Sequence, residues 1–156
     1  MSRKPLFFSI TALLLFGLVL WGNLRDNRLL VLSETQVLAA DQFWYDGFEL
    51  TMHAEIKVSA HLLDGPAVDL FVVDKENYQA LQAAMAGTLP FKLLEFEYFN
   101  RVSRPDLMDE YESGWESFAP GTYYIIVDHS VFGMAAPPLG DVDDRVGFMV
   151  NVETRR

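Results

Sequence analysis

The segment from Thr51 to Leu62 alternates between apolar and polar side chains, and no other feature constrains the fold as strongly. Its apolar residues stand at every second position: Met52, Ala54, Ile56, Val58, Ala60 and Leu62. Because successive side chains of a β-strand point to opposite faces, the pattern predicts a strand with one buried face and one solvated face. Such strands are typical of antiparallel sheets that meet water on one side.

Further segments predict strands by the same reasoning. Arg145 to Glu153 alternates in the same way, and five other segments are rich in apolar, β-branched and aromatic residues: Leu29–Leu38, Phe43–Leu50, Val68–Val73, Leu94–Phe99 and Thr122–Asp128. The polar, acidic residues 103–117 predict a long loop with at most one helical turn. About six or seven strands with frequent turns and one short helix predict a mainly β chain that folds as an antiparallel β-sandwich.

One short helix is expected between these strands. Asp74 is suited to cap a helix N-terminus, and Gly87 to the left-handed position that follows a helix C-terminus. Between them, Tyr78, Leu81 and Met85 recur at helical spacing and form one apolar stripe. We expect this helix to pack its stripe over an end or edge of the sheet.

An uncharged, almost wholly apolar run extends from Pro5 to Trp21. As a helix it would span roughly 26 Å, close to the bilayer core of about 30 Å. Arg3 and Lys4 precede it, which favours a retained single-pass anchor with its N-terminus in the cytoplasm. A cleaved secretory signal is the alternative, but no pair of small residues follows the run at the position that cleavage requires.

The run therefore predicts three parts of the chain. Residues 1–23 are expected to form the transmembrane anchor, residues 24–32 a juxtamembrane linker, and residues 33–156 an exported β-sandwich domain. A bacterial inner membrane, with the domain facing the periplasm, is the expected location.

The chain is acidic, with 22 Asp and Glu residues against 12 Lys and Arg and a formal net charge of −10. Only Arg3 and Lys4 of these charged residues precede residue 23, so the rest of the chain carries a formal charge of −12. Such a surface repels polyanions, which argues against a nucleic-acid partner. The chain has no cysteine, which excludes disulfides and thiolate metal sites.

Two segments resemble known β-sandwiches. VDLFVVDKENY (Val68 to Tyr78) and PGTYYIIVDHS (Pro120 to Ser130), followed by the closing strand, are similar to the jelly-roll-type sandwiches of bacterial pre-peptidase C-terminal domains. The GOLD-type sandwiches of membrane trafficking proteins look similar too. The resemblance implies a jelly-roll-like fold and an accessory or interaction module without catalytic residues.

An acidic turn near the end of the chain is a weak candidate for a calcium site. Asp141, Asp143 and Asp144 cluster there, and Ca²⁺ prefers several oxygen ligands. The turn lacks the Gly and the final Glu of an EF-hand loop, so a solvated acidic turn is the simpler interpretation. We expect no bound metal and no other cofactor.

The histidines do not predict a reactive site. His53 and His61 would stand about 27 Å apart along one strand, too far to bind one metal ion. His129 lies between Asp128 and Ser130, but no nucleophile elbow accompanies them. We interpret these residues as a polar cluster at a strand end, and we expect no catalytic residue in the chain.

Two further sets of residues have simple structural interpretations. The acidic set is expected to form solvated faces rather than an acid–base pair: Glu95, Glu97, Asp109, Glu110 and Glu112. The aromatic set is expected to pack mainly in the core, with a binding groove as the alternative: Phe43, Trp44, Tyr45, Phe48 and Trp115.

The connection from His129 to Asp144 contains an apolar stretch shaped by Gly and Pro. Its candidate partner contacts are Phe132, Met134, Pro137 and Leu139. The alternative is that Phe132 and Leu139 fold back to cover one end of the sandwich. The sequence thus favours a membrane-anchored, non-catalytic module that binds another membrane or envelope protein. A domain that senses a cation or small ligand through its acidic loops is the alternative.

Overall fold

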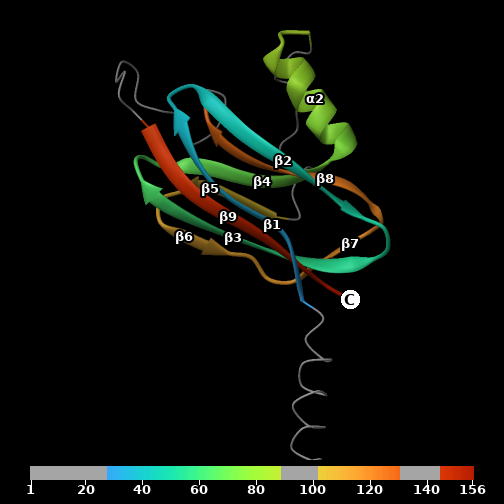
Figure 1. Ribbon diagram of the computed structural model, residues 1–156. Coiled ribbons are helices and arrows are strands. Elements are labelled where there is room, and N and C mark those ends of the chain that lie inside the picture. Colours follow the sequence, from blue (N-terminus) through green and yellow to red (C-terminus); the bar gives the residue numbers. More distant parts are fainter. Residues whose placement is uncertain (1–27, 89–101, 131–144) are drawn as a thin grey trace, which may run out of the picture.

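The computed structural model describes residues 28–88, 102–130 and 145–156, and these residues form two antiparallel β-sheets packed face to face (Figure 1). The five-stranded sheet contains, in spatial order, β1 (Leu29–Ala39), β9 (Arg145–Arg155), β3 (Ala54–Asp64) and, both beside β3, β6 (Glu110–Glu112) and β7 (Glu116–Phe118). The four-stranded sheet contains β2 (Gln42–Leu50), β8 (Gly121–His129), β4 (Val68–Asp74) and β5 (Val102–Leu107).

The order of the strands is that of a jelly roll. The chain alternates between the sheets from β1 to β4, and later β9 inserts between β1 and β3 while β8 inserts between β2 and β4. β6 and β7 both pair with β3 and act as one interrupted strand, which gives the eight strands of a jelly roll. The prediction of a mainly β, antiparallel sandwich is confirmed for the described residues.

β3 and β9 lie side by side in the five-stranded sheet and supply much of the core. Ile56 and Val58 are fully buried, while the residues between them face outward. In β9, Val146, Phe148, Val150 and Val152 form the matching buried row. The predicted alternation is confirmed from Ala54 onward, but Met52 is exposed because the chain bends at residues 51–53 before β3 begins.

The helix α2 (Lys75–Met85) has the predicted ends. Asp74 Oδ1 accepts a hydrogen bond from the backbone N–H of Asn77 at 2.8 Å, and Gly87 follows the helix with φ of +70°.

The position of α2 differs from the prediction, because the helix covers an outward sheet face rather than an end or edge (Figure 1). Tyr78 stacks on Tyr124 of β8 with 3.9 Å between the ring centroids. Phe71, Val73 and Ile126 also point away from the sandwich core and are buried here. Strands that are apolar on both faces need cover on both.

Residues 103–117, predicted as a loop, include β6 and most of β5 and β7. The loop prediction was wrong because β6 and β7 are short strands at a sheet edge and carry exposed acidic residues. Edge strands of three residues bury too few side chains to show an apolar alternation in the sequence. The predicted strand Leu94–Phe99 lies outside the described residues.

The predicted anchor, Pro5 to Trp21, also lies outside the described residues. Within the described ranges, no helix is both long enough and apolar enough to cross a bilayer. β1 begins at Leu29, so pairing with β9 starts inside the segment 24–32 that was predicted as a linker.

Candidate functional site

The outward face of the five-stranded sheet carries side chains in facing pairs. Residues of β3 and β9 lie directly opposite each other in four pairs: Glu55–Arg155, Lys57–Glu153, Ser59–Asn151 and His61–Met149. On the far side of β9, Ser33 of β1 donates a hydrogen bond from its Oγ to Asn151 Oδ1 at 2.7 Å. Asn151 Nδ2 in turn donates to Ser59 Oγ at 3.5 Å, so the third pair extends across three strands. These contacts fix the positions of the polar groups on this face.

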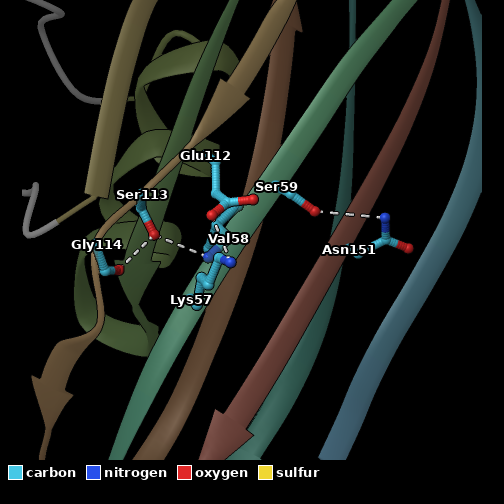
Figure 2. A network of polar contacts seen from close by, with 7 residues as sticks. All are labelled: Lys57, Val58, Ser59, Glu112, Ser113, Gly114 and Asn151. Atoms are coloured by element: carbon cyan, nitrogen blue, oxygen red, sulfur yellow. Dashed lines mark hydrogen bonds and ion pairs between the residues drawn. The ribbon is translucent and has the colours of Figure 1, made fainter.

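Ser113 lies between β6 and β7 and forms hydrogen bonds with the backbone of β3. The backbone N–H of Ser113 donates to the carbonyl of Val58 at 2.8 Å, and its Oγ accepts from the N–H of Val58 at 2.9 Å (Figure 2). The same Oγ donates to the carbonyl of Gly114 at 2.8 Å. One residue therefore satisfies both backbone groups of Val58 where the ladder is interrupted.

An ion pair on the outward face of the sheet also links β3 to β6 at the sheet edge. Lys57 Nζ lies 2.5 Å from Glu112 Oε1 (Figure 2). The Lys57 side chain is largely covered, whereas the Glu112 side chain is mostly exposed. The contact links the outward face of β3 to β6 and leaves one carboxylate at the surface.

Trp115 lies next to this edge, and three cationic groups approach its ring. Arg155 Cζ lies 4.4 Å from the ring centroid, Arg28 Cζ 5.7 Å and Lys57 Nζ 6.0 Å. Distances of this size favour cation–π attraction. Arg155 also donates from Nε to Glu55, and this hydrogen bond lowers the pKa of the Glu55 carboxyl. The indole is partly buried and held in place from several sides.

A shallow hollow of about 580 Å³ opens on the same face. Its lining comes from three strands: Ser59, Ala60, His61, Glu110, Tyr111, Glu112, Met149 and Asn151. His61 Nδ1 lies 3.0 Å from Glu110 Oε1, which joins β3 to β6 across the floor of the hollow. Burial raises the pKa of the Tyr111 hydroxyl. The hollow presents hydroxyl, amide, imidazole, carboxylate and thioether groups.

The predicted site residues separate in the structure. His61 and two acidic residues of the predicted solvated set, Glu110 and Glu112, come together at the hollow. His53 precedes β3 and is exposed, so the two histidines do not share a strand. Sequence reasoning did not single out Met149 or Asn151, because only the register of β9 against β3 places them there.

The predicted aromatic set divides: Trp44 and Phe48 pack with the core, Phe43 is partly buried beside α2, and Tyr45 is exposed. Trp44 lies against Phe148 with 5.6 Å between ring centroids, and Phe48 stacks on Tyr123 at 5.9 Å. Trp115 is the member of the set that joins the outward polar face. The core interpretation therefore holds for Trp44 and Phe48.

Asp128, His129 and Ser130 are buried at the end of β8. Asp128 Oδ1 accepts the backbone N–H of Ser130 at 2.9 Å. Asp128 also lies opposite Asp69 of β4, which is buried as well and which sequence reasoning missed. Burial raises the pKa of the Asp128 carboxyl, and the charge of Asp69 raises it further. The one sequence signal for Asp69 was an acidic residue inside an otherwise apolar strand.

The remaining candidates lie outside the described residues: Asp141, Asp143, Asp144, Phe132, Met134, Pro137 and Leu139. Within residues 28–88, 102–130 and 145–156, no group of three or more His, Asp or Glu side chains is arranged to hold a metal ion.

Comparisons with known proteins identify the fold. The chain matches no protein-family model and no curated protein sequence at a significant level. Among solved structures, it is similar to the pre-peptidase C-terminal domain of a collagenase from Bacillus anthracis, with 12% identity and a TM-score of 0.51, over 79% of this chain and 89% of that one. It also matches PliG, a periplasmic inhibitor of g-type lysozyme from Aeromonas hydrophila, with 12% identity and a TM-score of 0.43, over 81% and 87% of the two chains.

The likeness to the collagenase domain shows a shared fold. It confirms the resemblance to bacterial β-sandwich accessory domains that Val68–Tyr78 and Pro120–Ser130 suggested.

Proposed function

We propose that this chain is a membrane-anchored, non-catalytic β-sandwich module that binds another protein and helps to assemble a complex in the bacterial envelope. Residues 5–21 would hold it in the inner membrane, with the sandwich in the periplasm. The observation that carries the proposal is the outward face of the five-stranded sheet. There, the hollow and Trp115 are held in place by cross-strand contacts and face solvent.

The composition of this face suits recognition of a protein. Trp and Arg are enriched among the residues that contribute most to protein–protein binding, and Met is enriched at interfaces. Trp115 and Arg155 lie together at one end of the proposed binding face, and Met149 lies roughly 20 Å away along β9 at the hollow; all three side chains are at least partly accessible. Side chains that are already ordered lose little entropy on binding.

The arrangement at the end of β8 does not favour a hydrolase. Successive residues of a strand point to opposite faces, so Asp128 cannot orient the imidazole of His129 as a catalytic dyad requires. Asp128 instead accepts the N–H of Ser130. The polar groups of this cluster are buried, which leaves them out of reach of a substrate from solution.

Co-purification of the full-length protein from native membranes in mild detergent tests the proposal. Met149→Ser changes the hollow, and Met108→Ser is the matched control because Met108 is exposed but lies outside the hollow. We expect Met149→Ser to lose co-purifying proteins while its melting temperature stays unchanged, and Met108→Ser to retain them. Equal recovery of the same proteins with both variants would contradict the proposed face.

The apolar connection provides a second proposed contact. Phe132, Met134, Pro137 and Leu139 follow β8 in the sequence, and we propose that they contact the same partner. The double variant Phe132→Ser with Leu139→Ser should lose partners without a change in melting temperature. A fall of many degrees with partners retained would assign these side chains to the core instead.

Calcium titration separates the alternative function, a sensor domain, from this proposal. Asp141, Asp143 and Asp144 would be its ligands. Calorimetry of the full-length protein in detergent should show no saturable heat with Ca²⁺. A saturable heat that Asp143→Asn abolishes would favour the sensor.

The anchor has its own test. Mass spectrometry of the membrane-extracted protein should find peptides from Arg3 to Asn23 still attached. A mature N-terminus between Gly22 and Asp41 would show a cleaved signal.

A further inference from the structure

The two edges of the five-stranded sheet are built differently. One edge consists of β6 and β7, which have three residues each and are separated by residues 113–115. It carries the exposed acidic residues Glu110, Glu112 and Glu116. Short strands, interruptions and charged side chains are the means by which proteins prevent a sheet edge from pairing with another chain.

The other edge, β1, has fewer of these protections. It is 11 residues long, contains no Pro or Gly, and carries one charged residue, Glu34. Leu29, Leu30 and Val37 are each more than half exposed. Among the described residues, β1 pairs with β9 on one side and with no strand on the other. A row of backbone donors and acceptors is therefore available along this edge.

We propose that β1 pairs in the antiparallel direction with β1 of a second copy of this chain, so that two five-stranded sheets become one continuous sheet. Pairing centred on Thr35 places Ser33 of one copy opposite Val37 of the other, and Glu34 opposite Gln36. The charged residue of each strand then meets an amide rather than a like charge. Within one copy, Gln36 Nε2 already donates to Glu34 Oε2 at 3.3 Å, so these two groups are compatible partners.

The same register also aligns the faces of the two sheets. Facing residues of an antiparallel pair point to the same side, and the pairing puts the core residue Leu32 opposite Leu38, which is also a core residue. The irregularity of β1 lies between Leu30 and Leu32, before this regular stretch. The inner face of each copy would therefore continue into that of the other through two Leu32–Leu38 pairs, with the two Glu34–Gln36 pairs between them.

The low charge of β1 reduces the electrostatic cost of bringing a second copy to this edge. Each copy carries a formal net charge of −10, so two copies repel each other in most orientations. At β1 each strand contributes one charged residue, Glu34, and the proposed register pairs it with Gln36. Added salt therefore weakens the long-range repulsion between the copies and has no ion pair of the contact to screen. We therefore expect dimerisation to strengthen as salt is added, which is opposite to the behaviour of an interface built from salt bridges.

A ladder of this length buries less surface than a stable dimer in solution requires. Two copies held in one membrane meet at a much higher effective concentration, so a weak contact is sufficient there. In this respect alone, the inference rests on the proposed function, through its membrane anchor.

Cysteine cross-linking of the full-length protein in its native membrane tests the pairing directly, because the chain has no cysteine of its own. Thr35 is exposed on β1 and would face its own copy across the two-fold axis, at a separation of about 5 Å between Cβ atoms. Ser117→Cys, exposed on β7 at the protected edge, is the matched control. Under mild oxidation we expect a disulfide-linked dimer from Thr35→Cys and little from Ser117→Cys. Equal yields at both positions, or no dimer from Thr35→Cys, would overturn the proposal.

A charge placed at the centre of the pairing provides an independent measurement. Thr35→Glu would put two carboxylates opposite each other, whereas Thr35→Gln has nearly the same size without the charge. In native membranes, chemical cross-linking should show dimerisation weakened by about fivefold or more in Thr35→Glu relative to Thr35→Gln. Equal dimerisation of the two variants would contradict pairing at β1. Thr35 lies opposite Met149 of the hollow, so the two proposals are separated with Met149→Ser, which should lose the co-purifying proteins and still give the Thr35→Cys cross-link.

Discussion

Asp69 and Asp128 show how much a single residue in this fold depends on its cross-strand neighbour. The two carboxylates lie opposite each other on β4 and β8, and both are buried. Asp69 Oδ1 accepts the N–H of Asp106 at 2.8 Å, while Asp128 accepts that of Ser130. Backbone donors thus partly compensate two negative charges that are kept out of water.

Asp128→Asn should make the protein more stable at neutral pH. Burial and the charge of Asp69 raise the pKa of Asp128, so the folded protein holds this proton more tightly than the unfolded chain does. The stabilisation from proton binding is complete below the unfolded pKa and is lost as pH rises through the folded pKa. Melting temperatures of both proteins from about pH 4 to about pH 7 should therefore diverge in favour of Asp128→Asn. The asparagine keeps an oxygen for the Ser130 N–H.

Asp109→Asn serves as the control for this pH series, because Asp109 is exposed. It should follow the wild-type protein across the same range. A wild-type protein that gains stability relative to Asp128→Asn as pH rises would reverse the sign of the argument.

Ser113→Ala should destabilise the protein by about 1–3 kcal/mol, because the N–H of Val58 is then left without its acceptor in a buried position. Urea unfolding gives the free energy of unfolding directly. Ser117→Ala removes a hydroxyl from an exposed position on the same edge and should cost less. Equal losses for the two serines would show that the bridge to Val58 has no special importance.

At the scale of the elements, the strands that bury many side chains were the ones that the sequence predicted correctly. β3 and β9 bury one face along their whole length, and this imposes the alternation that Thr51–Leu62 and Arg145–Glu153 show. β6 and β7 contribute few buried side chains, so their sequences look like a loop, and only pairing with β3 makes them strands. The helix was predicted from its ends, but its position depends on the apolar outward faces of β4 and β8.

The helix cap can be tested at this scale. Asp74→Ala removes the oxygen that accepts the Asn77 N–H, and we expect a loss of about 1 kcal/mol in the free energy of unfolding. Asp74→Asn keeps an acceptor at the same position and should cost less. If the two variants unfold alike, the loss comes from the charge near the helix N-terminus rather than from the hydrogen bond.

At the scale of the whole molecule, the candidate site arises from segments far apart in the sequence. Trp115 meets Arg28, Lys57 and Arg155, which stand before β1, on β3 and on β9. The sequence could name Trp115, His61 and Glu110 as separate residues. It could not predict which of them lie close together, because the hollow depends on the registers of β3 with β9 and of β3 with β6.

Deletion of residues 145–156 should abolish cooperative folding. β9 lies between β1 and β3, so its loss leaves both strands without their main partner and removes a fully buried row that includes Val146 and Val150. Circular dichroism during heating should show no sharp transition for the shortened chain. Deletion of Arg156 alone, which follows β9, should leave the transition intact. A cooperative transition without β9 would mean that β1 and β3 can close the sheet by themselves.

The central place of β9 also sets the timing of folding as the chain is made. Ser33 and Asn151, partners across β1 and β9, are 118 residues apart, and a ribosome adding 5–20 residues per second needs roughly 6–24 s to synthesise that interval. During this delay β1 lacks its partner strand β9, so its backbone hydrogen-bonding groups and apolar side chains can contact other chains. An edge strand that stays unpaired for this long is exposed to pairing with other chains until β9 has been made.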